Sequence, residues 1–155
     1  MANTRMILDG EHEELLEMLE EVSSNKAGTG DIFSGVLRIF RNHLKKESET
    51  VIPLLGYLKD RLDGVDRGKK IDLSRAGSRF KESYPVMMQE HAEMSNLIRM
   101  AQDSVKTKPD KLASKLASDL LHHVTLEEEF LYPAAFASAD LVGSENRDSG
   151  HEIKR

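Results

Sequence analysis

Hydrophobic side chains recur with a helical period along four separate stretches of this sequence. In each stretch the face residues return every three or four positions and share one side of an α-helix, while charged residues occupy most other positions. The four faces consist of Leu8, His12, Leu15, Leu19 and Val22; Phe33, Val36, Phe40, His43, Glu47, Val51 and Leu54; Tyr84, Met87, His91, Met94, Ile98, Ala101 and Val105; and Leu112, Leu116, Leu120, His123, Glu127, Phe130 and Leu131. No alternation typical of β-strands competes with this pattern. Four amphipathic helices are therefore predicted.

Three polar breaks separate the four predicted helices. Residues 23–30 contain Ser, Asn and Gly, and residues 108–110 contain a proline. Residues 63–78 form the longest connection and are rich in Gly, Lys, Arg and Asp. Helices joined by short or moderate connections pack beside their sequence neighbours in opposite directions. We therefore predict an all-α fold, an antiparallel up-down four-helix bundle.

Prolines indicate where the helical faces begin or end. Pro53 predicts a kink near the end of the second helix, and Pro85 fits the first turn of the third. Pro133 marks the end of the fourth regular face. Because the chain becomes polar a few residues later, we expect one domain over residues 1–139 and a flexible polar tail over residues 140–155.

The charge of the chain narrows the range of partners. The formal net charge is −5, and the basic residues are interleaved with acidic ones rather than gathered in a stripe. We therefore expect neither nucleic acid nor an anionic membrane as a partner, and the sequence identifies no protein partner. No apolar run approaches the ~20 residues of a membrane-spanning helix, and the N-terminus has no apolar signal segment. A cytoplasmic protein is the simplest interpretation.

Six ionisable side chains occupy positions that each helix would otherwise fill with apolar residues. They are His12, His43, Glu47, His91, His123 and Glu127. Burying carboxylates and imidazoles without partners costs several kcal/mol per charge. The chain has no cysteine, which excludes thiolate zinc sites and iron–sulfur clusters. A bound cation would compensate all six side chains at once.

The six residues form an internal repeat. The pattern His-x-x-x-Glu occurs at His43 and again 80 residues later at His123, and each histidine is followed by a proline ten positions on. The two single histidines, His12 and His91, are 79 residues apart. Each half of the chain therefore contributes one histidine followed by one His-x-x-x-Glu pair.

This spacing suits a shared metal centre. Residues four apart project from one helix face about one turn from each other, so the His and Glu of a pair can reach the same metals. A single pair of this kind is usually a surface contact, and a lone inward histidine is usually a hydrogen-bonded core residue. Four inward histidines with two such glutamates in register favour a metal site over these structural roles.

The arrangement resembles the hemerythrin-like (HHE cation-binding) family. The resemblance covers about residues 1–137 and includes Glu128 and Pro133 beside the second pair. It implies a cofactor of two non-haem iron ions with terminal histidine ligands and an oxo or hydroxo group between the irons. It also implies that Glu47 and Glu127 are the bridging carboxylates.

One position departs from the oxygen-carrying members of that family. They have a fifth histidine one turn after the histidine of the third helix, where this chain has Ser95. A four-His, two-Glu set is more similar to the branch associated with nitric oxide and iron–sulfur repair. That branch usually carries an additional cysteine-containing module, whereas this sequence has no cysteine.

These features lead to one preferred function and two alternatives. Fewer protein ligands leave open positions at the metals, which favours a small diatomic ligand, oxygen or nitric oxide, for sensing, scavenging or redox chemistry. The first alternative is a di-iron enzyme that reduces nitric oxide or peroxide or supplies iron for iron–sulfur repair. The second is a structural or interaction bundle that holds zinc or no metal. A ferritin-like site is excluded because the chain has no Glu-x-x-His pattern.

Two further residues lie near the predicted ligands. His122 points about 100° away from His123 on the same helix, so a surface position is predicted for it. Tyr84 lies two turns before His91 on the same face. Core packing is the favoured role for Tyr84, with a hydrogen bond to a metal-bound ligand as the alternative.

Overall fold

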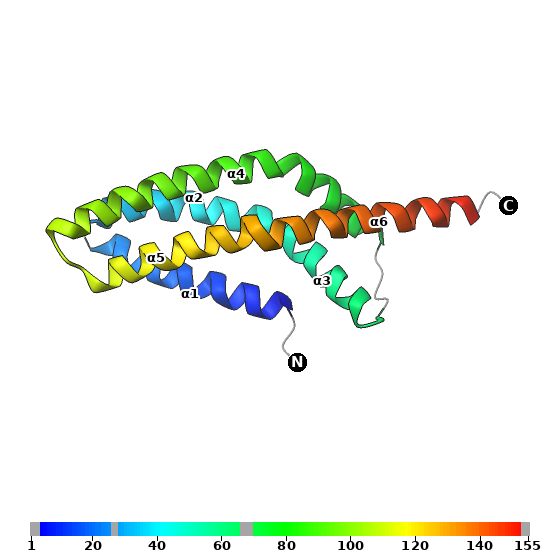
Figure 1. Ribbon diagram of the computed structural model, residues 1–155, viewed down its shortest axis with the longest axis horizontal. Coiled ribbons are helices and arrows are strands. Elements are labelled where there is room, and N and C mark those ends of the chain that lie inside the picture. The colour runs from blue at the N-terminus through cyan, green and yellow to red at the C-terminus, as the bar shows by residue number, and fades with distance from the viewer. Residues whose placement is uncertain (1–3, 26–27, 66–69, 153–155) are drawn as a thin grey trace.

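The computed structural model describes residues 4–25, 28–65 and 70–152 of the chain, and this part is helical without any β-strand (Figure 1). The helices are α1 (Thr4–Ser24), α2 (Gly30–Glu49), α3 (Val51–Leu62), α4 (Lys70–Thr107), α5 (Lys111–Leu126) and α6 (Tyr132–Glu152), with a π-helical turn (Glu127–Leu131) between the last two. The prediction of an all-helical chain is confirmed.

Four of these helices, α1, α2, α4 and α5, pack together around the site. α1 contacts α2, α2 contacts α4, α4 contacts α5, and α5 closes the ring against α1. Two apolar clusters fill the interior. The first contains Leu19, Phe33, Phe40, Ile98 and Leu116, and the second contains Leu54, Phe80, Met87, Tyr132 and Ala135, among others. Along each of the four helices the predicted ligands lie between residues of these two clusters or next to one of them.

The first His-x-x-x-Glu helix is interrupted just after its glutamate. α2 ends at Glu49, and Thr50 has a non-helical backbone (φ −128°, ψ −70°) before α3 begins. The hydroxyl of Thr50 donates to the carbonyl oxygen of Lys46 at 2.7 Å. Pro53 has no N–H with which to continue the helical ladder. The predicted kink near Pro53 is thus confirmed.

The second His-x-x-x-Glu helix is interrupted at the corresponding place, but in another way. Residues Glu127–Leu131 form a π-turn, in which the N–H of Tyr132 donates to the carbonyl oxygen of Glu127. Pro133 follows and again lacks an N–H. The predicted end of the regular face at Pro133 is therefore a widened turn, beyond which the chain continues as α6.

The long connection predicted over residues 63–78 is wrong in its second half. α4 already begins at Lys70, so Pro85 lies inside this bent helix rather than in its first turn (Figure 1). The reason is tertiary packing. Gly77 lies so close to α6 that a Cβ added to it would be 3.2 Å from the Cβ of Ala139. Contact with α6 holds a segment in the helix that its local composition assigns to a loop.

The flexible tail predicted over residues 140–155 is also wrong for most of its length, because α6 continues well into it. Val142 is buried, and Glu145 accepts a hydrogen bond from the hydroxyl of Tyr57. Arg61 lies 2.9 Å from the same carboxylate. α3 therefore holds this part of α6 through side chains that are distant in sequence. The last three residues of the chain lie outside the described part.

Among the described residues, no helix is both long enough and apolar enough to cross a membrane.

Candidate metal centre

All six predicted ligands meet in the interior of the four packed helices. His12 is 7% exposed, and the other five residues are at most 2% exposed. Their donor atoms fall into two groups that share one residue. The first group contains His43, Glu47, His91 and Glu127, and the second contains His12, His123 and Glu127. Within each group the donor atoms all lie within 4.8 Å of one another, so each group could hold a metal ion.

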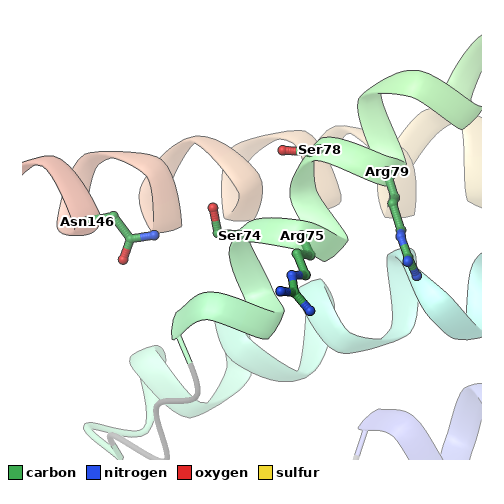
Figure 2. A pocket seen from close by; sticks show the side chains of 5 residues that line it. All are labelled: Ser74, Arg75, Ser78, Arg79 and Asn146. Carbon is green, nitrogen blue, oxygen red and sulfur yellow. The ribbon is translucent and has the colours of Figure 1, made fainter.

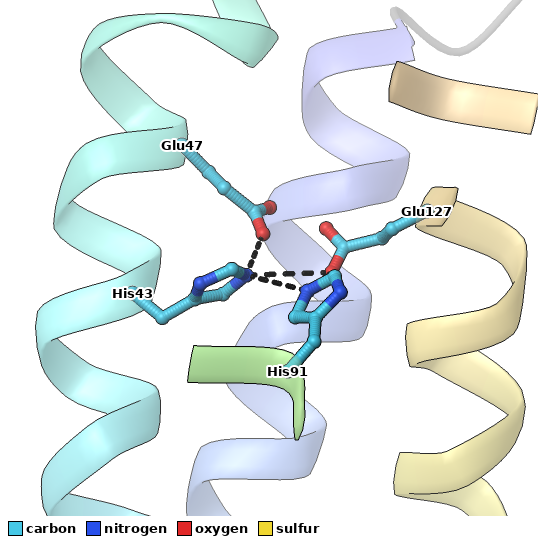
Figure 3. A group of neighbouring side chains, drawn as sticks. All are labelled: His43, Glu47, His91 and Glu127. Atoms are coloured by element: carbon cyan, nitrogen blue, oxygen red, sulfur yellow. Dashed lines mark hydrogen bonds and ion pairs between the residues drawn. The ribbon is translucent and has the colours of Figure 1, made fainter. Parts of the chain in front are cut away.

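The first group is drawn in Figure 3, where side chains from α2, α4 and the π-turn converge on one point. The Nε2 atoms of His43 and His91 are 3.0 Å apart, and His91 Nε2 is 3.1 Å from Oε1 of Glu127. Oε1 of Glu47 contacts His43 Nε2 directly. Two imidazole nitrogens and two carboxylates thus face one another without an apolar side chain between them.

Three donor atoms of the second group form no hydrogen bond within the described part of the chain. Nε2 of His12, Nε2 of His123 and Oε2 of Glu127 are buried and have no hydrogen-bond partner among the described residues. Nε2 of His123 lies 3.4 Å from Oε1 of Glu127. A buried polar atom without a partner costs about 1–3 kcal/mol, so such atoms are rare in folded proteins. A cation is the partner that fits two imidazole nitrogens and a carboxylate oxygen together.

Three carboxylates outside these groups hold the histidine rings in place. Glu90 lies 3.2 Å from Nδ1 of His43, and Lys46 in turn lies 2.8 Å from Glu90. Two further contacts of this kind, both of 3.0 Å, join Glu128 to Nδ1 of His91 and Glu11 to Nδ1 of His123. A carboxylate on Nδ1 directs Nε2 inward and makes it more basic, as around many metal-bound histidines. The sequence pattern did not assign this role to Glu11, Glu90 or Glu128, although each is adjacent to a predicted ligand.

The pKa values of the first group show that its buried carboxylates favour positive charge beside them. Burial by itself lowers the pKa of His43, but hydrogen bonds with Glu127, Glu47 and Glu90 outweigh it and raise this pKa to about 11. Burial and the nearby charge of Glu127 raise the pKa of Glu47 to about 8. Glu127 shows the opposite shift: burial opposes it, but hydrogen bonds with Glu47 and the histidines hold its pKa well below the usual value. In the absence of a metal, protons on His43 and Glu47 therefore balance the negative charge of the buried carboxylates.

In the second group the pKa values of the two histidines are also shifted in opposite directions. Burial, together with the neighbouring His123, lowers the pKa of His12 to about 4. The pKa of His123 is raised to about 9, because the adjacent carboxylate of Glu127 outweighs the effect of burial. At neutral pH His12 is therefore an uncharged imidazole with a free nitrogen, which is the form that binds metals.

Tyr132 also belongs to the site, and the sequence pattern did not indicate it. Its hydroxyl lies 3.0 Å from Oε1 of Glu47 and 3.2 Å from Nε2 of both His43 and His91. Its ring stacks on that of His91 with an angle of 11° between the planes. In a regular helix a residue five positions after Glu127 points about 140° away from it. The π-turn brings Tyr132 back to the same side, and the only local signal for it is the proline that follows.

Tyr84, the tyrosine that the sequence placed near the ligands, has the packing role. Its ring contacts those of Phe80, Tyr132 and Phe136, with centroids 4.9–6.0 Å apart. His122 is exposed, as predicted.

Ser95 lies beside the site rather than in it. It belongs to neither donor group. Together with His91 and Glu128 it lines a groove of about 430 Å³ between α4 and α5. The residue one turn after His91 therefore lines a surface groove beside the donor groups.

A second hollow, of about 370 Å³, lies far from these residues, between α4 and α6 (Figure 2). Ser74, Arg75, Ser78, Arg79 and Asn146 line it. In Figure 2 the guanidinium groups of Arg75 and Arg79 point away from Asn146, and both arginines are exposed. Because the polar groups of this hollow do not converge on one point, the histidine cluster is the better candidate for the functional site.

The donor set limits the kind of metal. Four imidazole nitrogens and two carboxylates, without sulfur, suit iron, zinc, manganese and similar divalent ions. The residues present therefore fit a metal pair of the kind that the sequence suggested. No protein-family model, curated protein or solved structure matches this chain.

Proposed function

We propose that this protein is a hemerythrin-like, antiparallel up-down bundle that holds two non-haem iron ions. In this proposal it binds a small diatomic molecule, oxygen or nitric oxide, for sensing, scavenging or redox chemistry. One observation carries it: three buried donor atoms, on His12, His123 and Glu127, have no hydrogen-bond partner among the described residues. They lie next to a second donor group that shares Glu127.

The sharing of carboxylates supports two metals rather than one. Glu127 belongs to both groups, with Oε1 close to His91 and Oε2 unpartnered. Glu47 faces both as well, because its Oε1 contacts His43 and its Oε2 lies 3.6 Å from Nε2 of His12. Both carboxylates thus lie against histidine nitrogens of both groups, as expected of carboxylates shared by two metals.

The surroundings support a small ligand. The donor groups lie next to two apolar clusters, and the ring of Phe40 is nearly perpendicular to those of His12 and His123, with centroids 6.4 and 6.3 Å away. These side chains exclude water and bulky molecules from the second group. When bound, iron would supply redox chemistry and open coordination positions, whereas the protein supplies the shape and the size limit.

The groove beside Ser95 supports the alternative that the protein is a di-iron enzyme. Glu128 lines this groove and contacts Nδ1 of the buried His91, so in this alternative Glu128 relays protons between solvent and the site. Reduction of nitric oxide or peroxide, or delivery of iron for iron–sulfur repair, would use the same six ligands.

Metal analysis of protein purified without added metal tests the proposal. We expect about two iron ions per chain. Glu127→Ala is expected to lose most of the iron, because it removes the residue that both groups share. The matched control is His122→Ala, which changes an exposed histidine next to a proposed ligand and should leave the iron content unchanged. An iron-free protein, or equal iron in the Glu127→Ala variant, contradicts the proposal.

Optical spectra then separate the possible functions. Absorption bands that appear with oxygen or nitric oxide and reverse on removal support binding or sensing. Sustained consumption of nitric oxide or peroxide supports the enzyme. Zinc in place of iron, without any such bands, supports the structural bundle.

A further inference from the structure

Tyr132 places a phenol oxygen inside the first donor group. Its side chain is 1% exposed, and its hydroxyl is within 3.2 Å of Glu47 Oε1, His43 Nε2 and His91 Nε2. The sulfur of Met87, at 4.0 Å, is the next polar atom in contact with it. The hydroxyl is therefore surrounded by proposed metal ligands rather than by the usual partners of a core tyrosine.

The distances are those expected of atoms that share one metal. Neighbouring ligands around a six-coordinate ion with bonds of about 2.1 Å are about 3.0 Å apart, because they subtend a right angle. The hydroxyl is 3.0–3.2 Å from the three donor atoms around it. Two of those atoms, Nε2 of His43 and of His91, are themselves 3.0 Å apart.

The phenol hydroxyl has one proton to donate among these three contacts. A tyrosine hydroxyl donates one hydrogen bond, and Glu47 is the neighbour that must accept it. A cation at this position would stabilise the phenol oxygen in its anionic form.

We propose that Tyr132 is a further ligand, giving a phenolate oxygen to the metal held by His43, Glu47, His91 and Glu127. This inference rests on the proposed function, because it requires the metal pair. The O–H bond breaks as the oxygen–metal bond forms, and the proton passes to the buffer. No electron is transferred in this step.

The two proposed metal positions then have different sets of protein ligands. In the internal repeat the position 80 residues before Tyr132 is Ile52, a buried side chain that has no donor atom. The first group gains an oxygen ligand from Tyr132, whereas the second keeps only His12, His123 and the shared carboxylates. Exchangeable positions for a small molecule are therefore concentrated at the second metal.

Iron(III) added to the metal-free protein tests the inference. A phenolate bound to iron(III) gives a visible charge-transfer band, and Raman excitation in that band enhances tyrosine ring vibrations. The chain has three tyrosines. We expect the double variant Tyr57→Phe/Tyr84→Phe, in which Tyr132 is the only tyrosine, to keep the band at full intensity per iron. Tyr132→Phe is expected to lose the band.

The double variant decides the question even if Tyr132→Phe fails to fold. Iron bound at about two per chain without a tyrosine band overturns the role of Tyr132 and leaves the proposed function intact. A band that disappears in the double variant, or persists in Tyr132→Phe, also overturns it. Wild-type protein that binds no iron overturns both proposals.

Discussion

At the scale of single residues, each half of the chain supplies a glutamate that contacts a histidine of the other half. Glu11 precedes His12 in the first half but bonds His123 of the second, at 3.0 Å. Glu90 precedes His91 in the second half but bonds His43 of the first, at 3.2 Å. Each half therefore orients the His-x-x-x-Glu histidine of the other. One half alone has the ligand types but lacks the carboxylate that orients the histidine of its own His-x-x-x-Glu pair.

His12 gives a test at this scale that separates a metal ligand from a structural histidine. Its Nε2 is buried without a hydrogen-bond partner among the described residues, so it costs the metal-free protein about 1–3 kcal/mol. We predict that His12→Leu raises the free energy of unfolding of the metal-free protein by about that amount. Urea unfolding in the presence of a chelator measures the change.

The control for that experiment is His122→Leu, an exposed position where a change within about 0.5 kcal/mol is expected. With metal present wild type should be more stable than His12→Leu. The reason is that a ligand that binds only the folded state stabilises it by about 2.7 kcal/mol at a hundred times its dissociation constant. A metal-free His12→Leu variant that is less stable than wild type would show that His12 is a structural core residue.

At the scale of helices, the interruptions after the two glutamates shape the site. The break at Thr50 redirects α3, and the π-turn from Glu127 to Leu131 brings Tyr132 inward. Both interruptions precede a proline that cannot donate a backbone hydrogen bond. A π-turn within an α-helix is often found at functional sites, and here it adds a polar group to the centre.

The helical extensions of α4 and α6 depend on a close contact at Gly77. We predict that Gly77→Leu destabilises the protein by about 1–3 kcal/mol, because its side chain would meet Ala139 where even a Cβ is 3.2 Å away. Gly56→Ala, inside α3 with no atom within 4 Å of the added Cβ, should be neutral or more stable by up to about 1 kcal/mol. Thermal unfolding compares the two variants. Equal stability of Gly77→Leu and wild type would show that the two extensions do not depend on close packing.

At the scale of the whole molecule, metal uptake is coupled to protons. At pH 7 three groups carry a proton that a metal must displace, since the pKa is about 11 for His43, about 9 for His123 and about 8 for Glu47. His12 and Glu127 are already unprotonated, because the pKa of His12 is about 4 and that of Glu127 is lowered. Metal uptake should therefore release protons.

We predict that zinc or iron(II) added to the metal-free protein at about pH 7 releases these three protons, with a fourth from Tyr132 if it binds. The number should fall by about one as the pH rises through 8, because Glu47 then loses its proton before the metal arrives. Calorimetry in buffers of different ionisation enthalpy counts the protons. A count that is near zero, or one that rises with pH, contradicts this account of the site.

The sequence by itself determined the helices and the six inward polar residues. Helical periodicity and the internal repeat are local or regularly spaced signals, so they suffice to select His12, His43, Glu47, His91, His123 and Glu127, and the fold brings all six together. Only the tertiary structure decided the rest. Tyr132 enters the site because a π-turn changes the direction of the helix after Glu127. The start of α4 is helical because Gly77 packs on Ala139, and the end of α6 is held by contacts of Tyr57 and Arg61 with Glu145. These outcomes depend on contacts between residues far apart in the chain, which periodicity does not contain.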